Sequence, residues 1–200
     1  MRSRAAASVL ASAGFGTVHS MEGGIHAWQG LTAAGPPEAG MSFFPATAGP
    51  GELIALAWML EDGSRSFYAS CARTVPDSEA AKLFTDLTAA EEHHKAALLG
   101  LYQGATNNPP GPDFPRSVVQ ADEDRMEGGM KLSEALAWAK GRDSRELLEL
   151  SMALETDSYD LYIKMGRRVE GAEAKKVFGR LVEEEKGHLA RMAALLDRKL

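Results

Sequence analysis

Near its carboxyl terminus the chain places a glutamate and a histidine three residues apart on what would be the buried face of a helix. Glu185 and His188 lie on a line of residues with spacings of 3 and 4, and the other members of that line are apolar: Phe178, Leu181, Met192 and Leu195. This spacing is typical of the inward face of a helix. Burying an ionised carboxylate without a partner is costly. The pattern therefore predicts that Glu185 and His188 face a cation.

The same pattern occurs earlier in the chain, displaced by 94 residues. Glu91 and His94 form the first copy, and an upstream glutamate accompanies each copy at the same offset. Two glutamates and two Glu-x-x-His motifs on four helices are the ligand set of a dinuclear metal site in a four-helix bundle. The sequence thus predicts six metal ligands: Glu61, Glu91, His94, Glu155, Glu185 and His188.

The predicted donor atoms suit a pair of iron or manganese ions. Residues i and i+3 share a helix face, so each motif directs two ligands to one point. Four carboxylates and two imidazoles match the preferences of these metals. We expect the two motif glutamates to bridge the ions, with Glu61 and His94 on one ion and Glu155 and His188 on the other. The alternative, six polar residues that only pair with one another, leaves four carboxylates against two histidines.

Two tyrosines are related by the same offset. Tyr68 and Tyr162 each follow an upstream glutamate by seven residues, on the same helix face. Two interpretations stay open: they are core aromatics, or their hydroxyls bind a ligand carboxylate and orient it. Glu184 stands four residues before His188, but we expect it and Glu183 to be surface charges.

Four long helices must position these residues. Periodicity predicts helices over residues 51–72, 77–102, 144–169 and 172–198, with a short one over 132–140. The short link between the first two makes them antiparallel neighbours. Residues 103–130 show neither helical periodicity nor strand alternation, and this pattern predicts a long crossover. Such a crossover lets the third long helix start at the same end of the bundle as the first. The expected fold is an all-α four-helix bundle with a long crossover between its second and third long helices.

Composition supports a globular protein that binds cations. The 200 residues are 44% hydrophobic and 25% charged, which is ample for a core. The net charge of −6 lies within residues 41–200 and argues against nucleic acid as a partner. The sequence contains no run of 18 apolar residues, so it predicts no membrane-spanning helix. Cys71 is the only cysteine, which excludes an internal disulfide and favours the cytoplasm.

The first forty residues form a separate segment. Arg2-Ser3, Gly14-Phe15, the Gly23-Gly24 turn and Ala27-Trp28 resemble the carboxy-terminal end of a rhodanese-like domain. The nucleophilic cysteine of that family would precede Arg2, so we expect no sulfurtransferase activity. An Ala-rich linker with chance similarity is the alternative. The predicted organisation is a rhodanese-like fragment over residues 1–40, a linker over 41–50 and the bundle over 51–200.

Residues 51–200 resemble the rubrerythrin branch of the ferritin-like di-iron proteins through the two Glu-x-x-His motifs. The resemblance implies two iron ions, with manganese or zinc as substitutes, and an oxidoreductase that reduces hydrogen peroxide or reacts with dioxygen. The paired CxxC motifs of typical rubrerythrins are absent, so electrons would come from an external donor such as a rubredoxin-like protein. Ser158 stands where typical members carry an additional glutamate, which favours a symmetric six-ligand centre.

Two other functions remain open from sequence. The same ligands would serve a ferroxidase or iron-handling protein without peroxidase turnover, and the bundle could instead be a structural partner of the rhodanese-like unit. The long crossover would allow two chains to exchange helix pairs, so we expect a homodimer.

Overall fold

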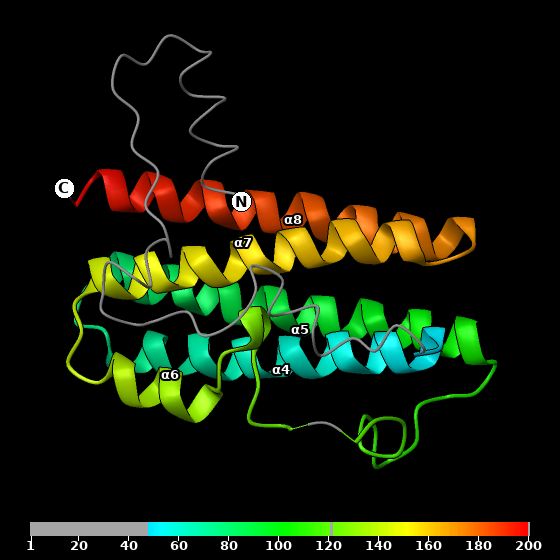
Figure 1. Cartoon of the computed structure of the whole chain (residues 1–200). Coiled ribbons are helices and arrows are strands. Elements are labelled where there is room, and N and C mark those ends of the chain that lie inside the picture. The colour runs from blue at the N-terminus through cyan, green and yellow to red at the C-terminus, as the bar shows by residue number, and fades with distance from the viewer. Residues whose placement is uncertain (1–47, 121, 200) are drawn as a thin grey trace, which may run out of the picture. The chain divides into compact units, whose positions relative to one another are not determined.

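The computed structural model describes residues 48–120 and 122–199, which fold into an all-α bundle (Figure 1). The expected all-α fold class is confirmed. The predicted rhodanese-like fragment and most of the predicted linker lie outside the described residues. None of the helices in the described ranges is long and apolar enough to cross a membrane. The elements are α4 (Pro50–Thr74), α5 (Ser78–Thr106), η1 (Glu127–Gly129), α6 (Leu132–Ala139), α7 (Ser144–Arg168) and α8 (Ala172–Asp197).

Local capping explains where these helices begin and end. The Asp77 carboxylate accepts a hydrogen bond from the Ala80 N–H at 2.8 Å and caps α5. Asp143 and Glu146 form a capping box at the start of α7. The long helices match their predicted ranges to within a few residues. The largest difference is at the end of α5, which continues to Thr106 before Asn107 adopts a left-handed conformation.

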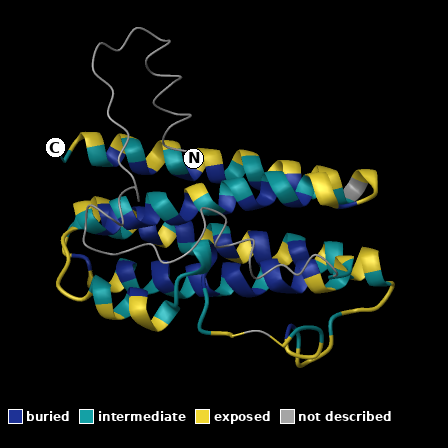
Figure 2. Ribbon diagram, in the orientation of Figure 1, coloured by how far each residue is buried: buried dark blue, intermediate teal, exposed yellow. Residues whose placement is uncertain are grey.

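The bundle consists of two helix pairs. α4 packs against α5, α7 packs against α8, and the pairs meet where α5 contacts α8. The short turn η1 contacts both α4 and α7, and α6 covers part of α4. Figure 2 shows that the buried residues of the long helices lie on their inward faces.

The apolar core is divided into two clusters. One contains Phe67, Phe84 and Leu154, and the other contains Leu60, Leu98 and Phe178. Along each of the four long helices, the residues of one cluster are separated in sequence from those of the other by buried polar residues. This division places a polar layer between two apolar ones, and that layer contains the predicted ligands.

Candidate metal centre

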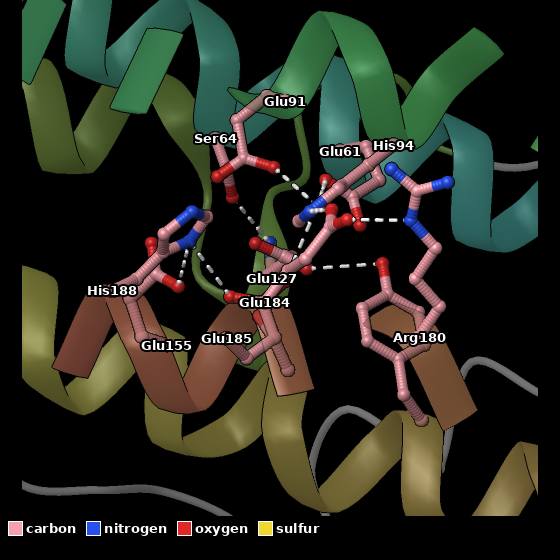
Figure 3. A network of polar contacts seen from close by, with 12 residues as sticks. Glu61, Ser64, Glu91, His94, Glu127, Glu155, Arg180, Glu184, Glu185 and His188 are labelled. Atoms are coloured by element: carbon pink, nitrogen blue, oxygen red, sulfur yellow. Dashed lines mark hydrogen bonds and ion pairs between the residues drawn. The ribbon is translucent and has the colours of Figure 1, made fainter. Parts of the chain in front are cut away.

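The six predicted ligand residues converge in the middle of the bundle, where the close view shows their side chains pointing toward one another (Figure 3). All four glutamates are 0% exposed, and the histidines are 1% and 5% exposed. Each long helix contributes, because the inward stripe of each helix carries its polar residues between apolar ones. The six residues are Glu61 on α4, Glu91 and His94 on α5, Glu155 on α7, and Glu185 and His188 on α8.

One group of donors surrounds His94. Its Nδ1 lies 3.1 Å from Glu91 Oε2, 3.2 Å from Glu185 Oε1 and 3.4 Å from Glu61 Oε2. None of these contacts has the alignment of a hydrogen bond, and Nδ1 has no hydrogen-bond partner among the described residues. Three carboxylate oxygens that converge on one imidazole nitrogen without hydrogen bonding to it are donors that could hold a metal ion.

A second group lies around His188. Its Nδ1 is 3.1 Å from Glu155 Oε2 and 3.2 Å from Glu185 Oε2. Glu91, Glu155 and His188 each offer an atom within 4.8 Å of the others, as do the four residues of the first group. Glu91 belongs to both groups, and Glu185 contacts both histidines. This arrangement places both glutamates between the groups, and their role as bridging ligands stays a prediction.

The two tyrosines differ in what their hydroxyls contact. Tyr68 donates a hydrogen bond of 2.7 Å to Glu155 Oε1. Tyr162 instead donates, at 3.3 Å, to Glu127, which is not one of the six predicted ligands. Both tyrosines are fully buried and belong to the two apolar clusters. They therefore fill the core and also contact buried carboxylates.

Glu184 contacts the outer nitrogen of His94, contrary to the expectation of a surface charge. Its Oε2 lies 3.0 Å from His94 Nε2, and Arg180 Nε donates to its Oε1 at 2.7 Å. Glu184 is one third exposed, so it borders the site from the solvent side. A carboxylate on the outer nitrogen of a histidine fixes the ring and makes the inner nitrogen a better ligand. The helical repeat could not reveal this contact, because it crosses from α8 to α5.

Glu127 is the site residue that the sequence analysis missed. It lies in η1, on the connection between α5 and α7, and is 0% exposed. Its backbone N–H donates to Ser64 Oγ at 3.3 Å, and Figure 3 shows its side chain among the predicted ligands. No periodic pattern surrounds it in the sequence. The one local signal is the Gly128-Gly129 pair, which indicates a tight turn.

Burial and mutual repulsion raise the pKa values of three carboxyl groups, whereas hydrogen bonds lower the pKa of a fourth. Burial raises the pKa of Glu91, and the charge of Glu155 adds to the rise. Burial and neighbouring carboxylates hold the pKa of Glu127 and of Glu185 well above the ordinary range. Burial acts the same way on Glu155, but hydrogen bonds from Glu185, His188 and Tyr68 outweigh it and lower its pKa to about 2.

The pKa of His94 is raised, although burial alone would lower it. Burial lowers the pKa of His94, but the close contact and negative charge of Glu91, with further carboxylates nearby, raise it to about 9. Buried carboxyl groups with raised pKa values beside an imidazole that favours its cationic form indicate an excess of negative charge. A bound cation would compensate this excess.

The residues present fit a metal centre. Several buried carboxylate oxygens have no hydrogen-bond partner among the described residues, on Glu61, Glu91, Glu127 and Glu185. Buried polar atoms are nearly always satisfied in folded proteins, so such a cluster requires an explanation. Carboxylate and imidazole donors from four helices suit iron or manganese.

A surface groove of about 450 Å³ borders the site beside His188. It opens between α5 and α8, and His188 contributes to its wall. The lining residues are Ala90, His93, Glu183, Glu184, Gly187, His188 and Arg191.

Comparisons with known proteins identify a matching family and a similar fold. Residues 52–196 match the family model of rubrerythrin. The fold is similar to the solved structure of a hypothetical protein from Pyrococcus furiosus, with a TM-score of 0.62 and 24% sequence identity. That match covers 82% of this chain and 95% of the other, and at this identity it shows a shared fold. A search of curated proteins found no match.

Proposed function

The chain belongs to the rubrerythrin family, and from this premise we propose that it binds two iron ions and acts as an oxidoreductase on hydrogen peroxide or dioxygen. The observation that carries the proposal is the buried cluster of carboxylates and imidazoles with unpartnered oxygens. An external one-electron donor would supply the electrons. Manganese and zinc are possible substitutes for iron at the same donors.

In this proposal the helices hold ligands for two ions side by side. Glu61 and His94 would belong to one ion, Glu155 and His188 to the other, and the remaining two glutamates would be shared. When bound, two ferrous ions supply the two electrons that, with two protons, reduce one hydrogen peroxide to two waters.

The protein's own groups would orient the ligands and admit the oxidant. The Tyr68 hydroxyl fixes one oxygen of Glu155 and leaves the other directed toward His188. Glu184 fixes the ring of His94 from outside. The groove beside His188 would let a small oxidant approach the centre, while the two apolar clusters keep bulk water away on either side.

The test compares peroxide consumption with mineral formation. Protein loaded anaerobically with Fe(II) is mixed with hydrogen peroxide, and the oxidation of iron is followed by stopped-flow absorbance. We expect rapid oxidation of two ferrous ions for each peroxide consumed, followed by repeated turnover when a reductant is present. Growth of a mineral on addition of excess iron, without peroxide turnover, would instead support iron handling.

A matched pair of variants controls this experiment. Glu185→Gln changes a buried member of the cluster, whereas Glu134→Gln changes a largely exposed glutamate on α6 that does not line the groove. We expect the first substitution to abolish the rapid phase and the second to leave it unchanged. Equal rates in both variants would contradict the proposed centre.

A further inference from the structure

We infer that Glu127 is a seventh metal ligand, a carboxylate that the connection between α5 and α7 inserts into the middle of the bundle. This inference rests on the proposed function, because it concerns the same metal centre. It differs from the symmetric six-ligand centre expected from the sequence, since Glu127 has no counterpart in the 94-residue repeat. Three independent features of the structure support it.

The first feature is the burial of an unpartnered oxygen. Glu127 is 0% exposed, its Oε1 is 3.3 Å from the Tyr162 hydroxyl, and its Oε2 has no hydrogen-bond partner among the described residues. The nearby Ser158 hydroxyl donates to the backbone oxygen of Leu154, and the Ser158 and Ser64 side chains lower the pKa of Glu127 by less than burial raises it. Burying an ionised carboxylate without a partner costs on the order of several kcal/mol of folding free energy. Its persistence in this position is explained if Oε2 faces a cation.

The second feature is a pair of small residues in the repeat, which leave space for the Glu127 side chain. Ser64 and Ser158 are related by the 94-residue offset, and each follows an upstream glutamate by three residues. Both serines are 0% exposed, so each places a small side chain on the inward face of its helix. η1 contacts both α4 and α7, and the Glu127 N–H donates to Ser64 Oγ. One carboxylate from the connection thus lies beside two small residues of the repeat.

The third feature is a backbone adapted to bring the connection close. A Cβ at Gly63 would lie 2.2 Å from the backbone oxygen of Arg125, so only glycine allows this approach to α4. Gly128, directly after Glu127, has φ of 72°, and a Cβ there would lie 2.8 Å from Asp157 Oδ2. Hydrogen bonds of 3.0 Å between Met126 and Met130 and between Gly129 and Met126 close the turn. The turn therefore holds Glu127 in a fixed position.

A purely structural role for Glu127 makes a different prediction. If its side chain only filled space and accepted a hydrogen bond from Tyr162, glutamine would serve equally well. If it binds metal, the loss of one anionic oxygen donor should weaken the affinity even though the shape is kept.

The test uses Co(II) as an air-stable probe of both metal positions in the full chain. Glu127→Gln removes the charge, and Glu123→Gln removes the charge of an exposed glutamate on the same connection. We expect at least about tenfold weaker binding of one or both ions in Glu127→Gln, because even residues outside the ligand set contribute 10- to 100-fold. The visible absorption of bound Co(II) should also change, and Glu123→Gln should match the unmodified chain.

The outcomes separate the inference from the function on which it rests. Two ions bound with unchanged affinity and spectrum in Glu127→Gln would overturn the inference alone. Failure of the unmodified chain to bind two ions would overturn the proposed function and the inference together. If Glu127→Gln does not fold, Glu127→Asp carries the test, since it keeps the charge but withdraws the carboxylate by one methylene. Wild-type affinity and spectrum in Glu127→Asp would then overturn the inference.

Discussion

At the scale of single residues, the centre contains chemically identical groups with opposite electrostatic environments. Glu155 accepts hydrogen bonds that stabilise its ionised form, whereas Glu91, Glu127 and Glu185 are raised toward the protonated form by burial. The metal-free protein should therefore hold protons at some of these positions. Metal binding should release them, because a metal ligand must be deprotonated.

The metal-free protein should be most stable at mildly acidic pH. Carboxyl groups whose pKa values are raised bind protons in the folded state, so stability is lost as pH rises above their ordinary value of 4.5. His94, with a pKa of about 9 against an ordinary 6.5, adds a loss that begins near 6.5 and continues through about 9. Glu155, at about 2, acts oppositely, and its contribution is lost as pH falls from 4.5 toward 2.

Thermal melts in chelator at about pH 5.5 and 8.5 check this expectation. We expect a melting temperature at least about 3 °C higher at the lower pH, which corresponds to roughly 1 kcal/mol for a chain of this size. Glu91→Gln should raise the value at the higher pH, since it removes a crowded charge and keeps the shape. An equal or higher melting temperature at the higher pH, or a loss of stability in Glu91→Gln, would indicate paired structural carboxylates.

The two tyrosines should differ in their contribution to stability. Tyr68→Phe removes a short hydrogen bond to an ionised, buried carboxylate, and we expect a loss of about 1.5–3 kcal/mol in the free energy of unfolding. Tyr162→Phe removes a longer bond to Glu127, whose raised pKa favours the neutral form, and should cost about 0.5–1.5 kcal/mol. Denaturant unfolding in chelator measures both. A larger loss for Tyr162→Phe would contradict these assignments.

At the scale of elements, regular helices position the six repeated ligands and an irregular turn positions Glu127. The close approach of that turn depends on Gly63, where an added Cβ would collide with a backbone oxygen at 2.2 Å. Backbone cannot move aside as a flexible side chain can. Glycine is unfavourable in the middle of a helix because of its low helix propensity. At position 63 of α4 it is explained by packing, since the turn approaches too closely for any larger residue.

Gly63→Ala and Gly100→Ala form a matched pair that tests this packing. Both glycines lie inside long helices, but a Cβ at Gly100 would meet nothing within 4 Å. We expect Gly63→Ala to destabilise the protein by about 1–3 kcal/mol through overpacking. Gly100→Ala should stabilise it by up to about 1 kcal/mol, because alanine is the better helix former. Chemical denaturation measures both changes, and a stabilised Gly63→Ala would show that the turn does not press against α4.

The elements also explain what the sequence could and could not predict. Helical periodicity locates the long helices and their inward residues because both follow the 3.6-residue repeat. Glu61 and Glu155 were found this way, through apolar stripes and a common offset. Glu127 could not be predicted as a site residue, because it lies in a segment without helical periodicity and only the packing of that segment brings it inward. The contact of Glu184 with His94 could not be predicted, because the two residues lie on different helices.

At the scale of the whole molecule, a repeated pair of helices forms a centre whose symmetry is broken by residues outside the six repeated ligands. Glu184 fixes His94, while the position related by the offset is Ala90, which lines the groove beside His188. The two halves of the centre thus differ in outer contacts and in access from solvent. A small oxidant would approach the half that contains His188.

The connection between the helix pairs also allows an expectation about assembly. Its length would let α4 and α5 of one chain pack against α7 and α8 of another, as in an exchanged dimer. We expect a homodimer at micromolar concentration, with about twice the 21.4 kDa mass of the chain. Light scattering coupled to size-exclusion chromatography measures this mass, and a species of 21.4 kDa alone would contradict the expectation.

The central claim is that one buried cluster binds two metal ions as a coupled pair, and an anaerobic Fe(II) titration tests it most directly. Because the two groups of donors share Glu91 and Glu185, we expect saturation near two Fe(II) per chain. Glu185→Ala should lose the coupled pair, since its carboxylate contacts both histidines, whereas Glu183→Ala should bind as the unmodified chain does. Saturation at one ion per chain, unchanged by Glu185→Ala, would contradict the account.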